Sequence, residues 1–516
     1  MGLPRLIEAL LDPSSYPEPC AQVELRQTHI SYLFFTPRFV YKIKKPVDFG
    51  FLDFSILEKR RFFCAEEVRL NRRLAPDVYI GVVPVTEKDG KALMEGAGEP
   101  IEYAVKMKRL DARKSLEYAL EHGDVTTDII ERVAGRIARF HAEARTSAYI
   151  SSFGSVECIR KNIGENFDQT AGFVGTAISR ALFDRIKGYN DGFIRANEGL
   201  LRRRVEDGFV RDCHGDIHCD HVSISDGIEI IDCIEFNERF RYSDIVADAA
   251  FLSMDLDFRN RADLSRALDA AYFASSGDAE GKGLLDFYKC YRAYVRGKVA
   301  AFKSAEEEVG PEARRAALID AKRHFHLAGE YAEGGLKPML IVIRGLSGTG
   351  KSMVANLLAE NTGFCTLSSD LIRKELAGLA PSERRSEAYN EGIYAKEFTE
   401  KTYTTLIERA GNLLKAGRSV ICDATFSRQR HLRMAKEAAG EAGASFHLIE
   451  CAADDETIRK RLLKRLEDTG AVSDAGIEVY ERQKASYEAV EGPCLEVDTT
   501  APLNEALVKI IDGILG

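Results

Sequence analysis

The chain carries Gly345-Leu346-Ser347-Gly348-Thr349-Gly350-Lys351-Ser352, a glycine-rich run of the pattern G-x-x-x-x-G-K-S. An apolar run at residues 339–343 precedes it and predicts a buried parallel strand, and residues 353–358 have the apolar spacing of a helix. Glycines between a strand and a helix let the backbone fold around an anion, so that amide N–H groups and the helix N-terminus face phosphates. The run therefore predicts a loop that binds a nucleoside triphosphate.

The positions of this loop have different expected roles. We expect Lys351 to reach the β- and γ-phosphates and the Ser352 hydroxyl to bind Mg²⁺. The backbone around the phosphates would come from Gly345, Ser347, Gly348, Thr349 and Gly350. ATP and Mg²⁺ are therefore the expected cofactors.

Strand and helix signals alternate through residues 338–516. Further apolar strands are expected at residues 364–367, 419–422 and 446–451. This alternation predicts a doubly wound parallel sheet of the P-loop NTPase type. The glycine pair at residues 334–335 separates this domain from an expected helix at about residues 313–331.

Polar residues follow the expected strands, at the edge where such sheets bind ligands. Asp423 ends one strand and suits outer-shell binding of Mg²⁺. Asp370 follows another and could accept the proton of an attacking hydroxyl, with Arg373 nearby for a negative charge on the acceptor. The alternative for Asp370 is a helix cap, because Ser-Ser-Asp before an apolar helix is also a good N-terminal cap.

A helix expected at residues 456–467 carries three arginines. Arg461 and Arg465 are four residues apart and share a face that could close over the phosphates as a lid. Arg459 is better explained as part of a solvated charged surface.

These motifs give residues 338–516 a resemblance to the small P-loop kinases, the group that holds gluconate kinase, polynucleotide 5′-kinase and zeta-toxin-like enzymes. The resemblance rests on the loop, Ser369-Asp370, Asp423-Ala424-Thr425-Phe426 and the arginine-rich helix. It implies phosphoryl transfer from ATP to a hydroxyl group, and it leaves the acceptor open.

A second group of polar residues lies in the first two-thirds of the chain. Asp216 follows Cys213-His214-Gly215, Asp232 follows Ile230-Ile231, and a hairpin is expected between them with its turn at residues 225–227. This layout predicts a second kinase site, in which Asp216 takes the acceptor's proton and Asp232 holds Mg²⁺ on the ATP phosphates.

A zinc site is the alternative for this segment. It is rich in thiols and imidazoles, namely Cys213, His214, His218, Cys219 and His221. No C-x-x-C pair accompanies them, and Gly215 argues against the helix that would align His214 with His218. We favour the kinase interpretation.

The residues before this segment come in the order that a kinase needs. Residues 39–44 alternate as a strand, which places Lys42 and Lys44 on one face. One of them would bind the ATP phosphates, and we favour Lys42. Glu67, on the helix that follows, would pair with that lysine and hold it in place.

This order gives the N-terminal part a resemblance to the aminoglycoside phosphotransferase family, carried by His214-Gly215-Asp216 and Ile231-Asp232, with Ala138-Arg139-Phe140-His141 in support. The resemblance implies a two-lobed protein-kinase-like fold, with an N-lobe at residues 1–110 and a C-lobe with the catalytic loop at 111–332. It also implies a second metal ligand five residues after Asp216, where the family usually has Asn and this chain has His221. A loop that would cover the phosphates, at residues 28–34, contains no glycine.

The whole chain is therefore predicted to be an α/β and α+β multidomain protein that resembles the bifunctional aminoglycoside phosphotransferase/ATP-binding protein family. Its net charge of -9 argues against a protein that coats nucleic acid, so small-molecule hydroxyl groups are the expected acceptors and nucleic acid is the less favoured one. Its 11 cysteines without paired spacing fit a reducing cytoplasm, and we expect no membrane contact. One active P-loop kinase with a degenerate N-terminal binding module is the alternative.

Overall fold

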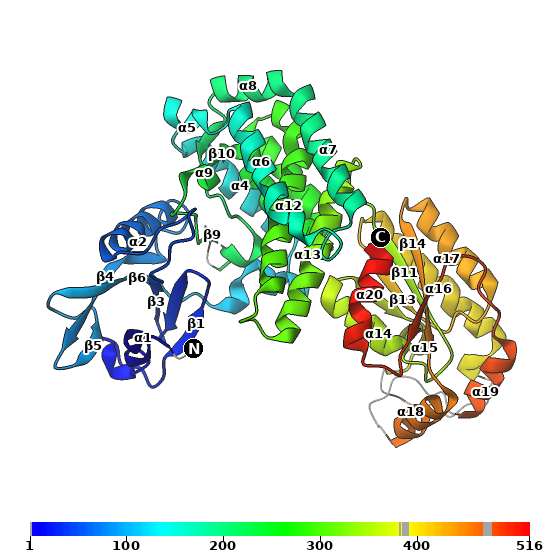
Figure 1. The fold of residues 1–516 in the computed structure, drawn as a ribbon. Coiled ribbons are helices and arrows are strands. Elements are labelled where there is room, and N and C mark those ends of the chain that lie inside the picture. The colour runs from blue at the N-terminus through cyan, green and yellow to red at the C-terminus, as the bar shows by residue number, and fades with distance from the viewer. Residues whose placement is uncertain (1–2, 226, 381–382, 384–391, 468–476, 516) are drawn as a thin grey trace. The chain divides into compact units, whose positions relative to one another are not determined.

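A computed structural model of the chain describes residues 3–515 except 226, 381–382, 384–391 and 468–476, and does not describe the side chains of residues 465–467. The chain forms two compact units (Figure 1). We call them the N-terminal unit, with Met1–Ile163, Asp191–Asp255 and Arg266–Tyr288, and the C-terminal unit, with Gly164–Asn190, Leu256–Ser265 and Lys289–Gly516. None of the described helices is long and apolar enough to cross a bilayer.

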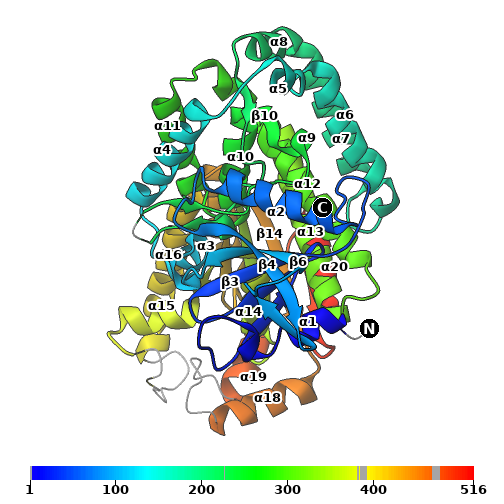
Figure 2. The ribbon, with the colours of Figure 1, turned by 90° about the vertical axis from the view of Figure 1, so that its left-hand side faces the viewer.

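An antiparallel sheet of six strands opens the N-terminal unit (Figure 2). Its order is β1 (Glu24–Gln27), β2 (Ser31–Phe35), β3 (Phe39–Lys44), β6 (Pro100–Lys108), β4 (Tyr79–Lys88) and β5 (Lys91–Met94). Because side chains alternate along β3, Val40 packs with the helix α2 (Leu57–Asn71), whereas Tyr41 and Ile43 pack on the other face near α1 (Arg5–Ala9). Lys42 and Lys44 therefore point towards α2.

The rest of the N-terminal unit is mainly helical. It contains α3 (Leu116–His122), α4 (Thr127–Glu143), α5 (Ala148–Ser152), α8 (Glu198–Glu206) and α9 (Glu238–Arg241). Two short antiparallel pairs join β7 (Val210–Asp212) with β10 (Tyr242–Asp244) and β8 (Val222–Ser223) with β9 (Glu229–Ile230). The second pair confirms the expected hairpin between Asp216 and Asp232.

The C-terminal unit contains a parallel sheet of five strands. Its order is β12 (Cys365–Ser368), β13 (Val420–Asp423), β11 (Met339–Arg344), β14 (Ser445–Ala452) and β15 (Leu495–Asp498). The helices of this part of the chain are α13 (Pro311–Ala332), α14 (Lys351–Thr362), α15 (Ser369–Leu376), α16 (Lys396–Lys415), α17 (Gln429–Glu441), α18 (Asp455–Glu467), α19 (Ile477–Ser486) and α20 (Leu503–Leu515). The predicted parallel α/β domain is confirmed.

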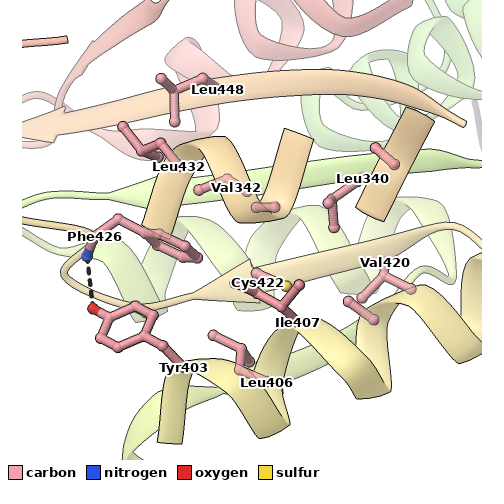
Figure 3. Close-up of a cluster of buried hydrophobic side chains, with 14 of the residues drawn as sticks. Leu340, Val342, Tyr403, Leu406, Ile407, Val420, Cys422, Phe426, Leu432 and Leu448 are labelled. Carbon is pink, nitrogen blue, oxygen red and sulfur yellow. Dashed lines mark hydrogen bonds between the residues drawn. The ribbon is translucent and has the colours of Figure 1, made fainter. Parts of the chain in front are cut away.

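Two apolar layers cover the two faces of this sheet, because alternate residues of the fully buried strand β11 point to opposite sides. Leu340 and Val342 lie in one layer with side chains of α16 and α17 (Figure 3). Met339, Ile341 and Ile343 lie in the other, with side chains of α14 and α20. The central position of β11 fixes the loop that follows it at the middle of the sheet's carboxyl edge.

The boundary between the two compact units lies inside helices. The division falls within α6 (Val156–Thr170), α7 (Arg180–Ala196), α10 (Ile245–Phe258), α11 (Ala262–Ser276) and α12 (Leu285–Ala305). Helix α13 lies in the C-terminal unit, where it packs on α20 and places Ile319 in the apolar layer of the sheet.

Candidate active sites

The phosphate-binding loop joins β11 to α14 through backbone shapes that need glycine. Gly345 has φ of 147°, and a Cβ atom added there would lie 2.6 Å from the carbonyl oxygen of Cys451. Gly350, which precedes the first residue of α14, has φ of 87°. These are left-handed conformations that other residues rarely adopt, so the glycines let the chain turn tightly into the helix.

Ser352 and Asp423 meet beside this loop. Strand β13 lies next to β11 with Asp423 opposite Ile343, which brings its carboxylate to the start of α14. The Ser352 hydroxyl donates to Asp423 Oδ2 at 2.6 Å, and Lys351 Nζ donates to the Leu346 carbonyl oxygen at 3.0 Å. A hydroxyl and a carboxylate are the oxygen ligands that Mg²⁺ prefers, so these residues fit the expected ion.

Asp370 lines the same pocket as Lys351, Ser352 and Asp423. It lies in the first turn of α15, whose N-cap is Ser368. Asp370 is therefore inside the helix and not at the cap position, so the capping alternative does not explain it. An aspartate in a first helical turn also lies favourably in the field of the helix.

Arg373 lines this pocket too, but it has a second task. Its side chain is almost enclosed, and Nη1 donates to the Ile393 carbonyl oxygen at 2.6 Å and to Thr399 Oγ1 at 3.1 Å. The arginine thus positions the start of α16. Two exposed cations that sequence reasoning missed, Lys396 and Arg428, line the same pocket.

The arginines of α18 have three different positions. Arg461 donates to Thr499 Oγ1 at 2.8 Å, to the Thr499 carbonyl oxygen at 2.6 Å and to the Gly348 carbonyl oxygen at 3.4 Å. It thereby joins the loop to the end of β15. Arg459 is exposed and pairs with Glu481, in keeping with a charged surface. The Arg465 side chain lies outside the described residues.

Helices α18 and α19 hold the loop from its other side. The Ser347 N–H donates to Gln483 Oε1 at 2.9 Å. Leu346 packs against an apolar cluster made by Ile458, Leu462 and Tyr480. Gln483 therefore occupies a backbone donor that a phosphate could use, a contact that the loop motif alone does not reveal.

The segment after β13 is held by aromatic contacts. Phe426 is fully buried with φ of 42°, and its N–H donates to the Tyr403 hydroxyl at 2.9 Å (Figure 3). The Tyr403 ring stacks on His431 with centroids 4.0 Å apart, and His431 Nε2 lies 3.1 Å from Glu400 Oε2. Tyr403, His431 and Glu400 all line the pocket, so they form part of its wall.

The predicted lysine and glutamate of the N-terminal unit form a buried ion-pair chain. Glu67 Oε1 lies 2.9 Å from Lys42 Nζ, and Glu67 Oε2 lies 2.7 Å from Lys44 Nζ. Lys44 also pairs with Glu235, and the whole side chain is enclosed. Lys42 Nζ contacts Asp232 Oδ1 at 2.7 Å, so it is Lys42 that faces the predicted metal carboxylate.

Asp232 is held in a strained backbone shape. Its φ is 65°, which is uncommon for a residue other than glycine. The Asp232 N–H donates to the Tyr79 hydroxyl at 3.1 Å, and the next N–H, of Cys233, donates to Asn71 Oδ1 at 2.8 Å. Burial would raise the pKa of Asp232, but the Lys42 ammonium and His221 together outweigh burial and lower that pKa well below its ordinary value.

A buried carboxylate organises the loop that carries Asp216. Asp248 accepts the N–H groups of His214 at 2.9 Å and Gly215 at 2.7 Å, and His141 Nε2 lies 3.1 Å from the same carboxylate. Burial would raise the pKa of Asp248, but these contacts, His141 first, lower it to about 2. The supporting histidine of the sequence motif thus acts on the loop through Asp248, which sequence reasoning missed.

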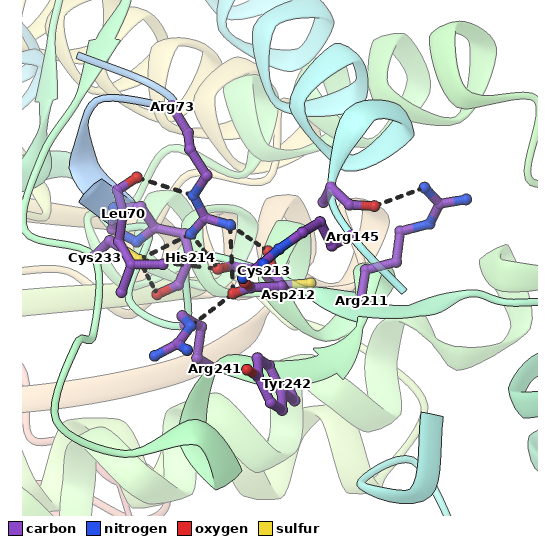
Figure 4. A network of polar contacts seen from close by, with 12 residues as sticks. Leu70, Arg73, Arg145, Arg211, Asp212, Cys213, His214, Cys233, Arg241 and Tyr242 are labelled. Carbon is purple, nitrogen blue, oxygen red and sulfur yellow. Dashed lines mark hydrogen bonds and ion pairs between the residues drawn. The ribbon is translucent and has the colours of Figure 1, made fainter. Parts of the chain in front are cut away.

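A second network fixes the start of this loop to α2 (Figure 4). Arg73 donates to the carbonyl oxygens of Asp212 at 2.6 Å and Cys213 at 2.9 Å. The buried Asp212 carboxylate accepts from Arg241 Nε at 2.7 Å and from Arg145 Nη2 at 3.1 Å. The network joins the helix that carries Glu67 to the loop that carries Asp216.

His221, the predicted second metal ligand, lies between the two aspartates. Its Nε2 is 3.7 Å from Asp232 Oδ2, and its Nδ1 is 2.9 Å from the Asp216 carbonyl oxygen. His218 and Asp216 complete a group whose ligand atoms all lie within 4.8 Å of one another. Neither Cys213 nor Cys219 belongs to that group. The thiol-imidazole set of the zinc alternative is therefore not gathered as a unit in the described residues.

Replacing Glu67 with glutamine is expected to destabilise the N-terminal unit by about 3–5 kcal/mol. The change removes the negative charge that the buried ammonium groups of Lys42 and Lys44 share. Lys42 and Lys44 lower the pKa of Glu67 although burial raises it. A carboxylate with a lowered folded pKa stabilises above its unfolded pKa and loses that contribution as the pH falls. Urea unfolding should therefore give wild type a larger free energy of unfolding than Glu67→Gln at neutral pH, and the difference should shrink as the pH falls.

The neighbouring change Glu66→Gln is the matched control. Glu66 pairs with Arg69 at the helix surface at 2.6 Å. Such pairs contribute less than about 1 kcal/mol. If Glu67→Gln and Glu66→Gln lost equal amounts of free energy of unfolding, the proposed importance of the buried ion pairs would be contradicted.

Comparison with known proteins agrees with the geometry of the C-terminal unit. Residues 340–490 match a family model described as an AAA domain. A solved structure of the Mycobacterium tuberculosis APS kinase is 20% identical, covers 35% of this chain and 99% of its own, and has a TM-score of 0.28. Residues 340–490 of the C-terminal unit thus resemble an AAA domain, and the loop at residues 345–352 lies within the matched range.

Two relatives match almost the whole chain. They are uncharacterized proteins of Mycobacterium tuberculosis (strain ATCC 25618 / H37Rv) and Mycobacterium bovis (strain ATCC BAA-935 / AF2122/97). Each is 30% identical over 458 residues, which cover 89% of this chain and 88% of the relative. The chain belongs to the same family as these two mycobacterial proteins.

Proposed function

We propose that the P-loop centre transfers the γ-phosphate of ATP to a hydroxyl group of a small molecule. The observation that carries this proposal is that Asp370 lines the same pocket as Lys351, Ser352 and Asp423. A proton acceptor and a phosphate-binding lysine at one pocket are the groups that phosphoryl transfer to a hydroxyl requires.

The residues have separate roles in this reaction. Asp370 takes the proton of the acceptor hydroxyl while the hydroxyl oxygen forms a bond to the γ-phosphorus. The bond between the γ-phosphorus and the oxygen that bridges it to the β-phosphate breaks, which releases ADP. Lys351 and the loop N–H groups stabilise the charge that develops on the phosphates. Mg²⁺ bound through Ser352 and Asp423 would neutralise part of the same charge. Arg461 is positioned to keep the loop in shape through Gly348.

We propose a second phosphotransfer centre in the N-terminal unit, with the kinase-like fold of the aminoglycoside phosphotransferases. The chain of contacts from Glu67 through Lys42 to Asp232 supports it, since a lysine held by a glutamate beside a carboxylate suits ATP phosphates. Asp216 is then the proton acceptor for a second hydroxyl. The competing function is a nucleotide-free binding module beside one active P-loop kinase.

Small cytoplasmic metabolites are the acceptors that we propose for both centres. The net charge of -9 disfavours a polyanionic acceptor such as a nucleic acid end. Lys396 and Arg428 at the P-loop pocket favour an acceptor that carries one anionic group in addition to its hydroxyl.

Counting bound nucleotides tests whether there are two centres. We expect the wild-type chain to bind two molecules of a non-hydrolysable ATP analogue in isothermal titration, and Lys351→Ala to bind one. A wild type that binds one and a Lys351→Ala variant that binds none would contradict the N-terminal centre and favour the single-kinase alternative.

A further inference from the structure

The N-terminal centre offers the wrong donor atoms for Mg²⁺. Mg²⁺ takes oxygen ligands in near-octahedral geometry, whereas two of the groups that meet here are imidazoles, His218 and His221. Imidazole together with carboxylate is the donor set of zinc, manganese and related transition metals. The residues present therefore do not fit the ion that the kinase resemblance implies.

Asp216, His218 and His221 each offer a ligand atom within 4.8 Å of the others, and Asp232 adjoins this group through His221. His218 Nε2 is 3.6 Å from Asp216 Oδ2, and His221 Nε2 is 3.7 Å from Asp232 Oδ2. Two ligands that are each about 2.1 Å from a tetrahedral ion lie roughly 3.4 Å apart. A contraction of a few tenths of an ångström would thus bring each pair into ligand contact.

The tautomer of His221 also suits a metal ligand. Its Nδ1 lies 2.9 Å from the Asp216 carbonyl oxygen, which can only accept a hydrogen bond, so Nδ1 carries the proton. That leaves Nε2 with its lone pair towards Asp232. Metal-binding histidines commonly donate their other N–H to a carbonyl in this way.

Charge and access are compatible with a divalent cation. Asp232 uses Oδ1 for Lys42 and presents Oδ2 to His221. The Asp232 and Asp216 side chains are 44% and 31% exposed, so an ion from solvent can reach both. Two carboxylates and two neutral imidazoles carry two negative charges, which match one divalent ion, while Glu67 already faces Lys42.

We infer that Asp216, His218, His221 and Asp232 form a site for a divalent transition metal of the zinc or manganese type, in place of Mg²⁺. This inference deepens the proposed N-terminal centre by naming its ion, and the ion would bind whether or not that centre turns over. His218 and Asp216 are ligands in addition to the two that the sequence predicts. Asp216 would bind the ion through Oδ2, the oxygen that faces the imidazoles, so the proton of an acceptor hydroxyl would go to its other oxygen, Oδ1.

The test measures metal binding by the full chain without nucleotide. Chelator-treated protein is titrated with Zn²⁺, Mn²⁺ and Mg²⁺ by calorimetry, and Co²⁺ is added as a coloured zinc substitute whose visible absorption reports the ligands. We expect one equivalent of transition metal at the site and far weaker binding of Mg²⁺. His221→Asn and His218→Asn should each weaken the transition metal on the order of a hundredfold or more.

The matched control is His122→Asn, the same chemical change at an exposed residue of α3. Circular dichroism checks that the variants are folded. The inference would be overturned if both His221→Asn and His218→Asn kept the wild-type affinity for transition metal and the wild-type Co²⁺ absorption. It would also be overturned if the wild-type protein bound Mg²⁺ more tightly than Zn²⁺ or Mn²⁺. Nucleotide counting is a separate readout, so loss of the second nucleotide with intact zinc binding would contradict the phosphotransfer proposal alone.

Discussion

Replacing Lys351 with alanine is expected to lower ATP-dependent phosphoryl transfer at the P-loop by roughly a thousandfold. Lys351 is the one side-chain cation that the loop itself supplies to the phosphates, and its Nζ already lies at the loop, 3.0 Å from the Leu346 carbonyl oxygen. Its removal leaves the charge that develops on the phosphates without that partner. The measurement is kcat/KM for release of ADP in the presence of a pool of small hydroxyl compounds.

The exposed lysine of α17, Lys436, provides the control. Lys436→Ala removes the same charge and side chain away from the pocket, so it should leave kcat/KM unchanged. If both lysine variants retained wild-type ADP release, the P-loop would not be the source of the activity.

Replacing Asp370 with asparagine is expected to slow turnover by about 10²- to 10⁴-fold while nucleotide affinity stays the same. Asparagine keeps the shape of the side chain and its place in the first turn of α15 but cannot accept the proton of the acceptor. Because the phosphates are bound by the loop, the affinity for an ATP analogue should not depend on this carboxylate. Steady-state kinetics and calorimetry on the same preparation separate the two effects.

Asp184→Asn is the control, since it makes the same change at an exposed pair with Arg180 on α7. A fall in nucleotide affinity that accounts for the whole loss in Asp370→Asn would assign Asp370 to binding. Unchanged turnover would remove it from the proposed mechanism.

Features that depend on neighbouring residues in the sequence could be predicted. The alternation in β3 placed Lys42 and Lys44 on one face, and both meet Glu67 there. The apolar run before the loop predicted β11 to within one residue. In each case a local pattern, either a two-residue period or a glycine-rich turn, sets the structure directly.

Contacts between distant residues could not be predicted in this way. Gln483 reaches Ser347 and Asp248 reaches His214 across long stretches of chain, and a glutamine on a helix or an aspartate in an apolar helix gives no local sign of its partner. The final strand β15 and Thr499, which binds Arg461, were missed for the same reason. The chemistry of the sites was visible in the sequence, whereas the residues that hold those sites in shape were not.

The most direct measurement follows the γ-phosphate itself. The full chain is incubated with ATP labelled at the γ-phosphate and with a pool of cytoplasmic metabolites, and the labelled products are identified by mass spectrometry, with Lys351→Ala in parallel. We expect a phosphorylated hydroxyl compound that wild type forms and Lys351→Ala does not. Label found only in inorganic phosphate, or the same products from both proteins, would contradict phosphoryl transfer at the P-loop.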